Sequence, residues 1–296
     1  MTTIKAFIDK HPLLSFFALA FAISWGGILL AVGLGPGGFS ATPQQFQKAV
    51  PYAVPAMVLG PAVAGILLTG LIDGRAGLSE FRARLLKWRV GARWYAVALF
   101  TAPLLIMGVM LALSLIYPEF LPRIFIATDK ASVLLLGIAV GLTAGICGEL
   151  GWTGFAVPRM RLRYGVLGTG LIVGFMFAAW DFLVVFWMSD VNSTAGALPM
   201  AIFLPVVLFS WLPTYRVLMV WVYERTNGSL LLAMLMHASL VAFWTNLTPL
   251  VTILTGMPLV IYYLVFTAAL WVVIGVVALA QGGHLTREPP LRRRVA

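Results

Sequence analysis

The sequence predicts an all-α fold: a polytopic membrane helix bundle of about eight transmembrane helices. Of the 296 residues, 61% are hydrophobic and only 10% are charged. A soluble domain carries about 25% charged residues, so this chain has too few to cover a water-facing surface. The apolar runs are about 20 residues long, which suits a transmembrane helix and is about twice the length of a membrane β-strand. We expect a single transmembrane domain over residues 1–296.

Eight apolar segments account for most of the chain. Their approximate bounds are 13–34, 52–72, 94–116, 131–157, 165–188, 198–223, 229–250 and 256–280. The first run is too long for the apolar region of a signal peptide and lacks a convincing cleavage site, so we expect it to remain as a span. The single cysteine, Cys147, lies inside the fourth run, where helix packing is its expected role.

The Lys and Arg residues are distributed unevenly between the two sets of loops. The net charge is +10. One set carries Lys5, Lys10, Arg75, Arg82, Arg84, Lys87, Arg89, Arg93, Arg159, Arg161, Arg163, Arg225, Arg287, Arg292, Arg293 and Arg294, and the opposite set carries Lys48, Arg123 and Lys130. This asymmetry predicts a multi-pass protein of the cell (plasma) membrane with both termini in the cytoplasm. The basic residues flank the spans, so we expect membrane lipids rather than nucleic acid as partners.

The longest basic loop, residues 73–93, reads DGRAGLSEFRARLLKWRVGAR. Its mixture of Arg and apolar residues is typical of a short amphipathic helix lying on an anionic membrane surface. A solvated connector is the alternative interpretation.

Four ionisable residues fall within predicted spans: Glu149, Asp181, Arg216 and His237. A charge at membrane depth costs at least about 2.5–3.5 kcal/mol, so each needs a partner or a function. Arg216 lies near the cytoplasmic half of its helix, where it can snorkel to the surface. His237 can be neutral and bonded to a backbone carbonyl. The two carboxylates are harder to explain structurally, and they indicate a present or ancestral site.

Small residues line the helix that carries Glu149. Glycines recur every three or four residues, at positions 141, 145, 148, 151 and 154. Such a face lets a second helix approach closely. We therefore expect Glu149 to be held against a neighbouring helix with little room for lipid.

Three blocks of sequence carry a resemblance to a known family. The blocks are GELGWTGFAVPRM (148–160), FMFAAWDF (175–182) and RVLMVWVYERTNGSLLLAMLMHAS (216–239). In order and spacing they resemble the Glu-Glu-x-x-x-Arg, Phe-x-x-x-His and His-x-x-x-Asn blocks of the CPBP intramembrane proteases, which include CAAX prenyl endopeptidases and bacteriocin-processing proteins. The likeness fits bacterial members. It implies a CAAX-protease-like core over about 131–250.

The resemblance also implies a chemistry. In that family the first Glu and the second-block His activate a water, and the third-block His and Asn stabilise the oxyanion. A base-activated water and a donor aimed at the developing oxyanion are what peptide hydrolysis needs. A divalent metal such as zinc is a further possible cofactor.

The sequence departs from the family pattern at four motif positions. The motif residues fall on Gly148, Glu149, Thr153, Asp181, His237 and Val241, of which only Glu149 and His237 match. The usual base is therefore absent at Gly148, and Val241 offers no hydrogen bond. Thr153 is not an Arg, so we expect Glu149 to lack its cationic partner at i+4.

We take Glu149, Asp181 and His237 as the candidate catalytic residues. The same three side chains form an acceptable ligand set for a divalent metal such as zinc. Alternatively, the two carboxylates share one proton and act as an acid–base pair. Counting along the helices from the predicted cytoplasmic ends puts Glu149 and His237 about 12 Å deep and Asp181 about 24 Å deep, so the count does not bring the three together.

Three functions remain open at this stage. The first is an intramembrane endopeptidase that acts on membrane or lipidated peptides through a substituted site. The second is a non-catalytic pseudoprotease that binds such peptides in an immunity or scaffold role. The third is a proton-coupled membrane transporter. The sequence indicates no oligomeric state and does not say which membrane-embedded or prenylated peptide is the substrate.

Overall fold

A computed structural model describes residues 3–35, 37–40, 42–188, 200–248, 257–283 and 285–286. Within these ranges the chain is helical and contains no β-strand. The α-helices are α1 (Thr3–Lys10), α2 (Pro12–Gly33), α3 (Pro43–Leu85), α4 (Ala92–Ser114), α5 (Arg123–Ile126), α6 (Lys130–Gly151), α7 (Val157–Met160), α8 (Val166–Met188), α9 (Met200–Phe209), α10 (Trp211–Arg225), α11 (Leu230–Leu247) and α12 (Met257–Leu279). A π-helical turn, Trp152–Ala156, joins α6 to α7.

Eight of the described helical stretches are long and apolar enough to cross a membrane. They confirm the all-α multi-span architecture that the sequence predicts. The α9–α10 pair supplies one span, Pro205–Arg225. The predicted segment ends at 198, 250 and 256 lie outside the described residues.

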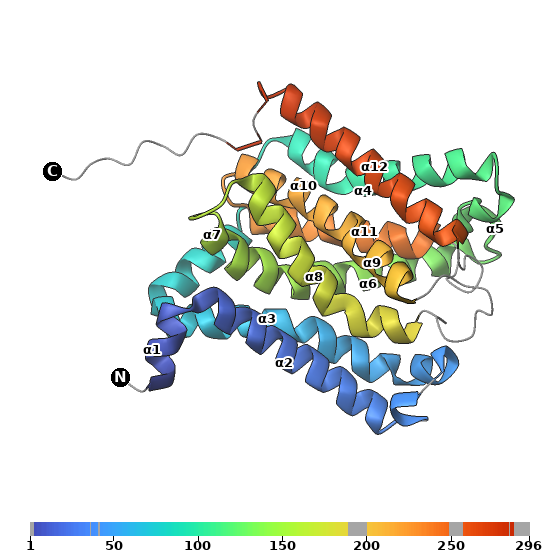
Figure 1. Cartoon of the computed structure of the whole chain (residues 1–296). Helices are drawn as coiled ribbons and strands as arrows, with labels where there is room; N and C mark the ends of the chain where they lie inside the picture. Colours follow the sequence, from blue (N-terminus) through green and yellow to red (C-terminus); the bar gives the residue numbers. More distant parts are fainter. Residues whose placement is uncertain are drawn as a thin grey trace.

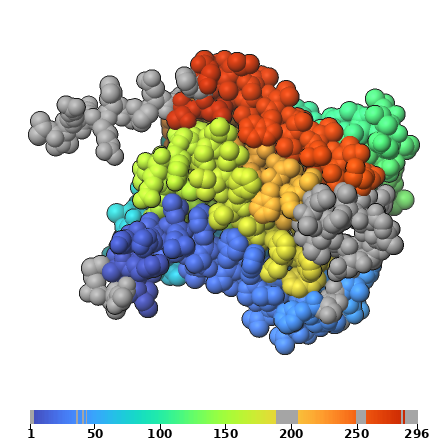
Figure 2. Space-filling model, viewed as in Figure 1, coloured from blue at the N-terminus to red at the C-terminus, as the bar shows by residue number. Residues whose placement is uncertain are grey.

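The spans form a bundle in which α2 and α3 pair along one side (Figure 1). Helices α6, α8, α10 and α11 make up the middle of the bundle, and α4 and α12 lie on the side away from α2. The space-filling view shows α2 and α12 at opposite edges of one face, with α8 between them (Figure 2). The four middle helices are those that carry the four ionisable residues of the spans.

Helix α10 is the most enclosed of the spans. Every residue from Trp211 to Tyr223 is buried, and 83% of its apolar window lies inside the protein. A polar side chain on this helix therefore reaches neither lipid nor water directly. This burial excludes the predicted snorkelling of Arg216, which is 3% exposed.

The predicted basic loops meet at one end of the bundle. Helices α1 and α7 lie at this end, and α5 lies at the other (Figure 1). Ionic contacts connect the loops: Arg159 pairs with Asp73, and Arg161 pairs with Glu224. The ammonium of Lys87 donates to the backbone oxygen of Asn227 at 2.9 Å. This grouping supports the loop assignment on which the predicted orientation depends.

The 73–93 segment is helical through Leu85 and continuous with the preceding span. Helix α3 changes direction at Gly74, where φ is +60° and ψ is −149°. Only glycine adopts this backbone conformation readily. Residues 75–85 are therefore helical, with Arg82 exposed and Phe81 buried against Leu230 and Met234 of α11, and the predicted placement on a membrane surface stays a prediction.

Candidate active site

Glu149 lies near the end of α6 and is fully buried. Nη1 of Arg216 donates to both of its carboxylate oxygens, at 2.7 Å and 2.8 Å. Nδ1 of His237 lies 2.7 Å from Oε1, and the hydroxyl of Thr153 donates to Oε2. One carboxylate thus has partners from α6 and its π-helical extension, from α10 and from α11.

Close helix packing makes this meeting possible. A Cβ added at Gly141 would lie 2.4 Å from the backbone oxygen of Ala238, and one at Gly145 would lie 2.5 Å from that of Met234. Both distances are far shorter than real Cβ contacts, so α6 and α11 approach each other as only glycine permits. This packing confirms the expectation that the small-residue face holds Glu149 against a neighbouring helix.

The π-helical turn begins three residues after Glu149. Such turns insert one extra residue into a helix and are frequent at functional sites. All five residues of this turn are buried. The turn contains both Thr153, which donates to Glu149, and Trp152, whose ring packs inside the bundle.

Arg216 supplies the positive charge that the family motif has at position 153, where this chain has Thr153. Its guanidinium also lies over the ring of Phe177, with Cζ 4.7 Å from the ring centroid. Glu149 therefore has no arginine at i+4, as expected, and its cationic partner comes from α10 instead. The sequence marks Arg216 as an ionisable residue within a span but does not indicate which acid it pairs with.

His237 is 4% exposed, and only one of its ring nitrogens has a hydrogen-bond partner among the described residues. An ionised carboxylate only accepts hydrogen bonds, so the Nδ1 that faces Glu149 carries the proton. Nε2 is then an acceptor. It is not one of the fully buried side-chain atoms without a hydrogen-bond partner. The ring edge packs against Phe177, with centroids 5.5 Å apart. The histidine is thus oriented with one basic nitrogen free.

Gly148 differs from the other glycines of this helix. A Cβ added there would meet Cε1 of His237 at 3.3 Å and Cδ1 of Trp152 at 3.8 Å. At Gly151 and Gly154 the nearest atoms would lie at 2.2 Å and 2.5 Å. Position 148 therefore faces His237, and a side chain there would overlap its neighbours less than one at Gly151 or Gly154.

Asp181 does not join the other two predicted site residues. On α8, Phe177 contacts His237, and Asp181 lies four residues, or about 6 Å, farther along the helix. Among the described residues, no three His, Cys, Asp or Glu side chains lie together as a metal-binding group. Glu149, Asp181 and His237 therefore do not fit a divalent metal such as zinc in this arrangement.

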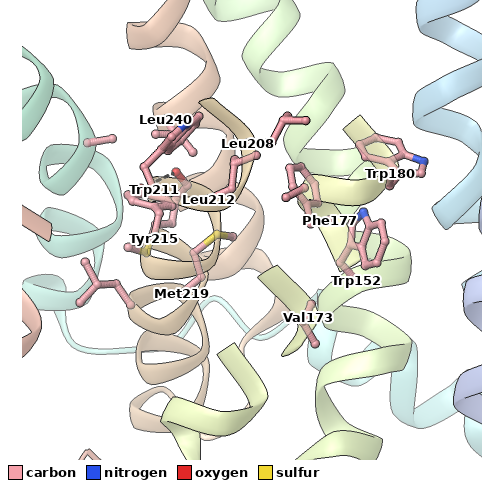
Figure 3. Close-up of a cluster of buried hydrophobic side chains, with 14 of the residues drawn as sticks. Trp152, Val173, Phe177, Trp180, Leu208, Trp211, Leu212, Tyr215, Met219 and Leu240 are labelled. Atoms are coloured by element: carbon pink, nitrogen blue, oxygen red, sulfur yellow. Dashed lines mark hydrogen bonds between the residues drawn. The ribbon is translucent and has the colours of Figure 1, made fainter. Parts of the chain in front are cut away.

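Two tryptophans beside the site were not singled out from the sequence. The rings of Trp152 and Trp180 make an edge contact at 5.7 Å, and both contact Phe177. Figure 3 shows the three rings grouped together, apart from the cluster around Trp211 and Tyr215. The indole nitrogens of Trp152 and Trp180 are buried and have no hydrogen-bond partner within the described part of the chain. No sequence signal distinguished these tryptophans from ordinary core residues.

The fold and the site define a multi-pass helical membrane protein built around a buried Glu–Arg–His group. Residues 130–243 match the family model described as type II CAAX prenyl endopeptidase Rce1-like. The match covers less than half of the chain and supports a protein of the CPBP family. The matched region contains all three motif blocks and every residue of the Glu149 site. A search of curated proteins finds no match.

Proposed function

We propose that the protein is an intramembrane endopeptidase of the CAAX-protease type, acting on membrane-embedded or prenylated peptides. The observation that carries this proposal is the hydrogen bond between Nδ1 of His237 and Glu149, which leaves Nε2 without a hydrogen-bond partner among the described residues. The role of Glu149 differs from the sequence-based expectation. Because its oxygens are held by Arg216 and Thr153, it orients His237 instead of acting as the base.

The hydrolytic step uses His237 as the general base. Nε2 accepts a proton from water while the water oxygen bonds to the carbon of the scissile carbonyl, whose oxygen becomes an oxyanion. The oxyanion then reforms the carbonyl, the C–N bond breaks, and the proton passes from Nε2 to the leaving nitrogen. The products are a carboxylic acid and an amine. General bases of this kind accelerate reactions by about 10²–10⁴-fold.

Neither a metal nor Asp181 enters this step. The described residues contain no group of three side chains that would hold a divalent ion, and Glu149 is already bonded to a guanidinium. Asp181 lies one helical turn beyond the His237 contact at Phe177. If Asp181 contributes, it does so at the part of the site occupied by a flanking portion of the peptide.

The proposed function includes an orientation of the protein in the membrane and a class of partner. We infer a plasma-membrane protein with both termini in the cytoplasm, because the basic loops gather at one end of the bundle. Anionic lipid headgroups are the partners that this basic end fits, and nucleic acid is not expected. The substrate peptide is expected to reach His237 from within the membrane.

A non-catalytic peptide-binding protein is the second candidate. It is favoured by Gly148, which places no carboxylate beside His237, and by Val241, which lies one turn beyond His237 and offers no side-chain donor. In such a pseudoprotease the Glu149 group would serve only to join α6, α10 and α11. No observation favours the proton-coupled transporter in the same way.

A cleavage assay separates the two candidates. The protein in lipid nanodiscs is incubated with a panel of membrane and prenylated peptides, beside His237→Gln and a positive control that carries Gly148→Glu, Asp181→His and Val241→Asn. Thr153 is left unchanged in the control because Arg216 already supplies the cation. Cleavage by the natural protein that His237→Gln abolishes supports the endopeptidase. Cleavage by the positive control alone supports the pseudoprotease.

A further inference from the structure

One side chain of α8 contacts both residues that hold Glu149 from α10 and α11. The guanidinium of Arg216 lies over the ring of Phe177, with Cζ 4.7 Å from the ring centroid. The ring of His237 meets the same ring in a T-shaped contact, with centroids 5.5 Å apart and planes at 74°. Phe177 has no hydrogen-bonding side-chain group, so its influence on the carboxylate acts through Arg216 and His237.

The hydrogen bonds of Arg216 do not fix its guanidinium by themselves. A guanidinium has several N–H donors, spread over Nε, Nη1 and Nη2. Within the described part of the chain, the side chain of Arg216 donates only through Nη1, and both bonds go to Glu149. Bonds from one nitrogen leave the guanidinium plane free to turn about that nitrogen. An aromatic face attracts a cation, most strongly where water is excluded, so the ring of Phe177 supplies the second contact that sets the plane.

The imidazole of His237 is constrained in the same way. Its hydrogen bond to the described residues joins Nδ1 to Oε1 of Glu149 at 2.7 Å. A single bond leaves the ring free to tilt about it, and the contact with Phe177 restricts that tilt. The arrangement is favourable, because aromatic rings prefer edge-to-face contacts with centroids about 4.5–7 Å apart.

Close packing of α8 against α10 places Phe177 beside Arg216. A Cβ added at Gly174, three residues before Phe177, would lie 2.3 Å from Cα of Pro213 and 3.1 Å from Cβ of Arg216. The shorter distance does not occur for real Cβ atoms, so only glycine allows this approach. Phe177 is 8% exposed, and its ring also packs on Trp152 at 5.5 Å (Figure 3). The ring is therefore held from two sides.

We propose that Phe177 is a positioning residue whose ring orients the Arg216 guanidinium and the His237 imidazole around Glu149. The inference rests on the proposed hydrolysis, in which the bond between Nδ1 and Glu149 orients the base, and deepens it by adding a residue from a further helix. Phe177 thus gives α8 a part in the site, although Asp181 on the same helix lies apart from the Glu149 group.

The test compares Phe177→Leu and Phe177→Tyr with a matched control, Phe155→Leu. Leucine keeps apolar bulk but has no aromatic face, whereas tyrosine keeps the ring. Phe155 is also fully buried and has an arginine, Arg159, over its ring at 3.7 Å. Within the described residues its ring packs on Phe16 and makes no ring contact with His237.

The readouts are the ¹⁵N spectrum of His237 in nanodiscs and the kcat and KM of any peptide that is cleaved. We expect Phe177→Leu to move the Nδ1 signal toward exchange between the two tautomers and to lower kcat by at least about tenfold, because the base is misoriented. KM should change little, since the ring acts through the base and not on the bound peptide. Phe177→Tyr should restore the signal and kcat, and Phe155→Leu should leave both unchanged.

Unfolding temperatures of the variants are measured alongside. A Phe177→Leu variant that unfolds earlier but keeps the natural His237 signal would overturn the inference, because the ring would then serve packing alone. So would an unchanged kcat, or a Phe155→Leu variant that alters the His237 signal equally.

A second substitution covers the case in which Phe177→Leu does not fold. Pentafluorophenylalanine at position 177 keeps the shape of the ring and removes its attraction for a cation, so an unchanged His237 signal would again overturn the inference. If no peptide is cleaved and the His237 signal still depends on the ring of Phe177, the positioning role stands and the proposed hydrolysis fails.

Discussion

At the scale of single residues, the Glu149 group is a buried charge pair with a histidine attached. Arg216 is 3% exposed and Glu149 is fully buried, so neither charge is compensated by water. Removing one member of a buried ion pair leaves the other unpaired in a low-dielectric interior. The group is therefore a stability element as well as a candidate active site.

The first prediction concerns this pair. We expect Glu149→Gln to lower the free energy of unfolding by about 3–5 kcal/mol, because the Arg216 guanidinium would remain buried without a counter-charge. Unfolding in mixed micelles titrated with a denaturing detergent measures the change. Asp9→Asn, which removes the partially exposed partner of Lys5, should cost less than about 1 kcal/mol. Equal effects of the two substitutions would show that the buried pair is not stabilising.

The second prediction concerns moving the positive charge beside Glu149 from position 216 to position 153. Thr153→Arg alone should destabilise the protein, because it would place a second guanidinium beside Arg216 in a fully enclosed position. Adding Arg216→Met should recover most of the lost stability, since Glu149 again has one cationic partner, now from the π-helical turn. Thermal unfolding of the two variants gives the result. No recovery in the double variant would mean that Arg216 does more than supply a charge.

At the scale of helices, the small-residue face of α6 has two functions. Gly141 and Gly145 allow contact with α11, and this contact brings His237 to Glu149. Gly148 lies on the same helix and faces the ring of His237, whose Cε1 is 3.3 Å from the position of an added Cβ. One periodic glycine pattern in the sequence thus combines packing positions with a position that faces the site.

The third prediction separates these two kinds of glycine. Gly141→Ala should cost about 1–3 kcal/mol through overpacking, because its Cβ would lie 2.4 Å from a backbone oxygen of α11. Gly148→Ala should change stability by less than about 1 kcal/mol, since alanine favours helix and the contact with His237 is only slightly tight. Thermal unfolding of both variants in the same detergent checks the difference. A Gly148→Ala variant as unstable as Gly141→Ala would assign position 148 to packing.

At the scale of the whole molecule, the ends of the bundle differ in charge. The basic loops are joined at one end by contacts such as those of Arg159 with Asp73 and Lys87 with Asn227. Arg123 and Lys130, at the ends of α5 and α6, belong to the opposite set of loops. This asymmetry is what orients a multi-pass protein during insertion.

The fourth prediction follows from the orientation. In a Cys147→Ser background, a cysteine at Ser79 should react with a membrane-impermeant maleimide only in inside-out vesicles. A cysteine at Glu119, in the exposed loop after α4, should react only in right-side-out vesicles. The reverse labelling pattern would place both termini outside.

Much of this architecture could be predicted from the sequence, because apolar length alone specifies a transmembrane helix. The glycine spacing also correctly placed Glu149 against a neighbouring helix. The Glu149–Arg216 pair could not be derived, since it depends on which helices are neighbours, and no local pattern encodes that. The same reason explains Asp181: its motif position suggested a shared site, but α8 carries Phe177 to His237 and leaves Asp181 one turn away.

The most direct test of the account is the protonation state of His237. The chain has three histidines, so ¹⁵N-histidine labelling in nanodiscs gives a simple spectrum, and His237→Gln identifies the signal. We predict a proton on Nδ1, because the carboxylate of Glu149 accepts the Nδ1 hydrogen bond. A proton on Nε2 and none on Nδ1 would contradict the claim that Glu149 orients His237.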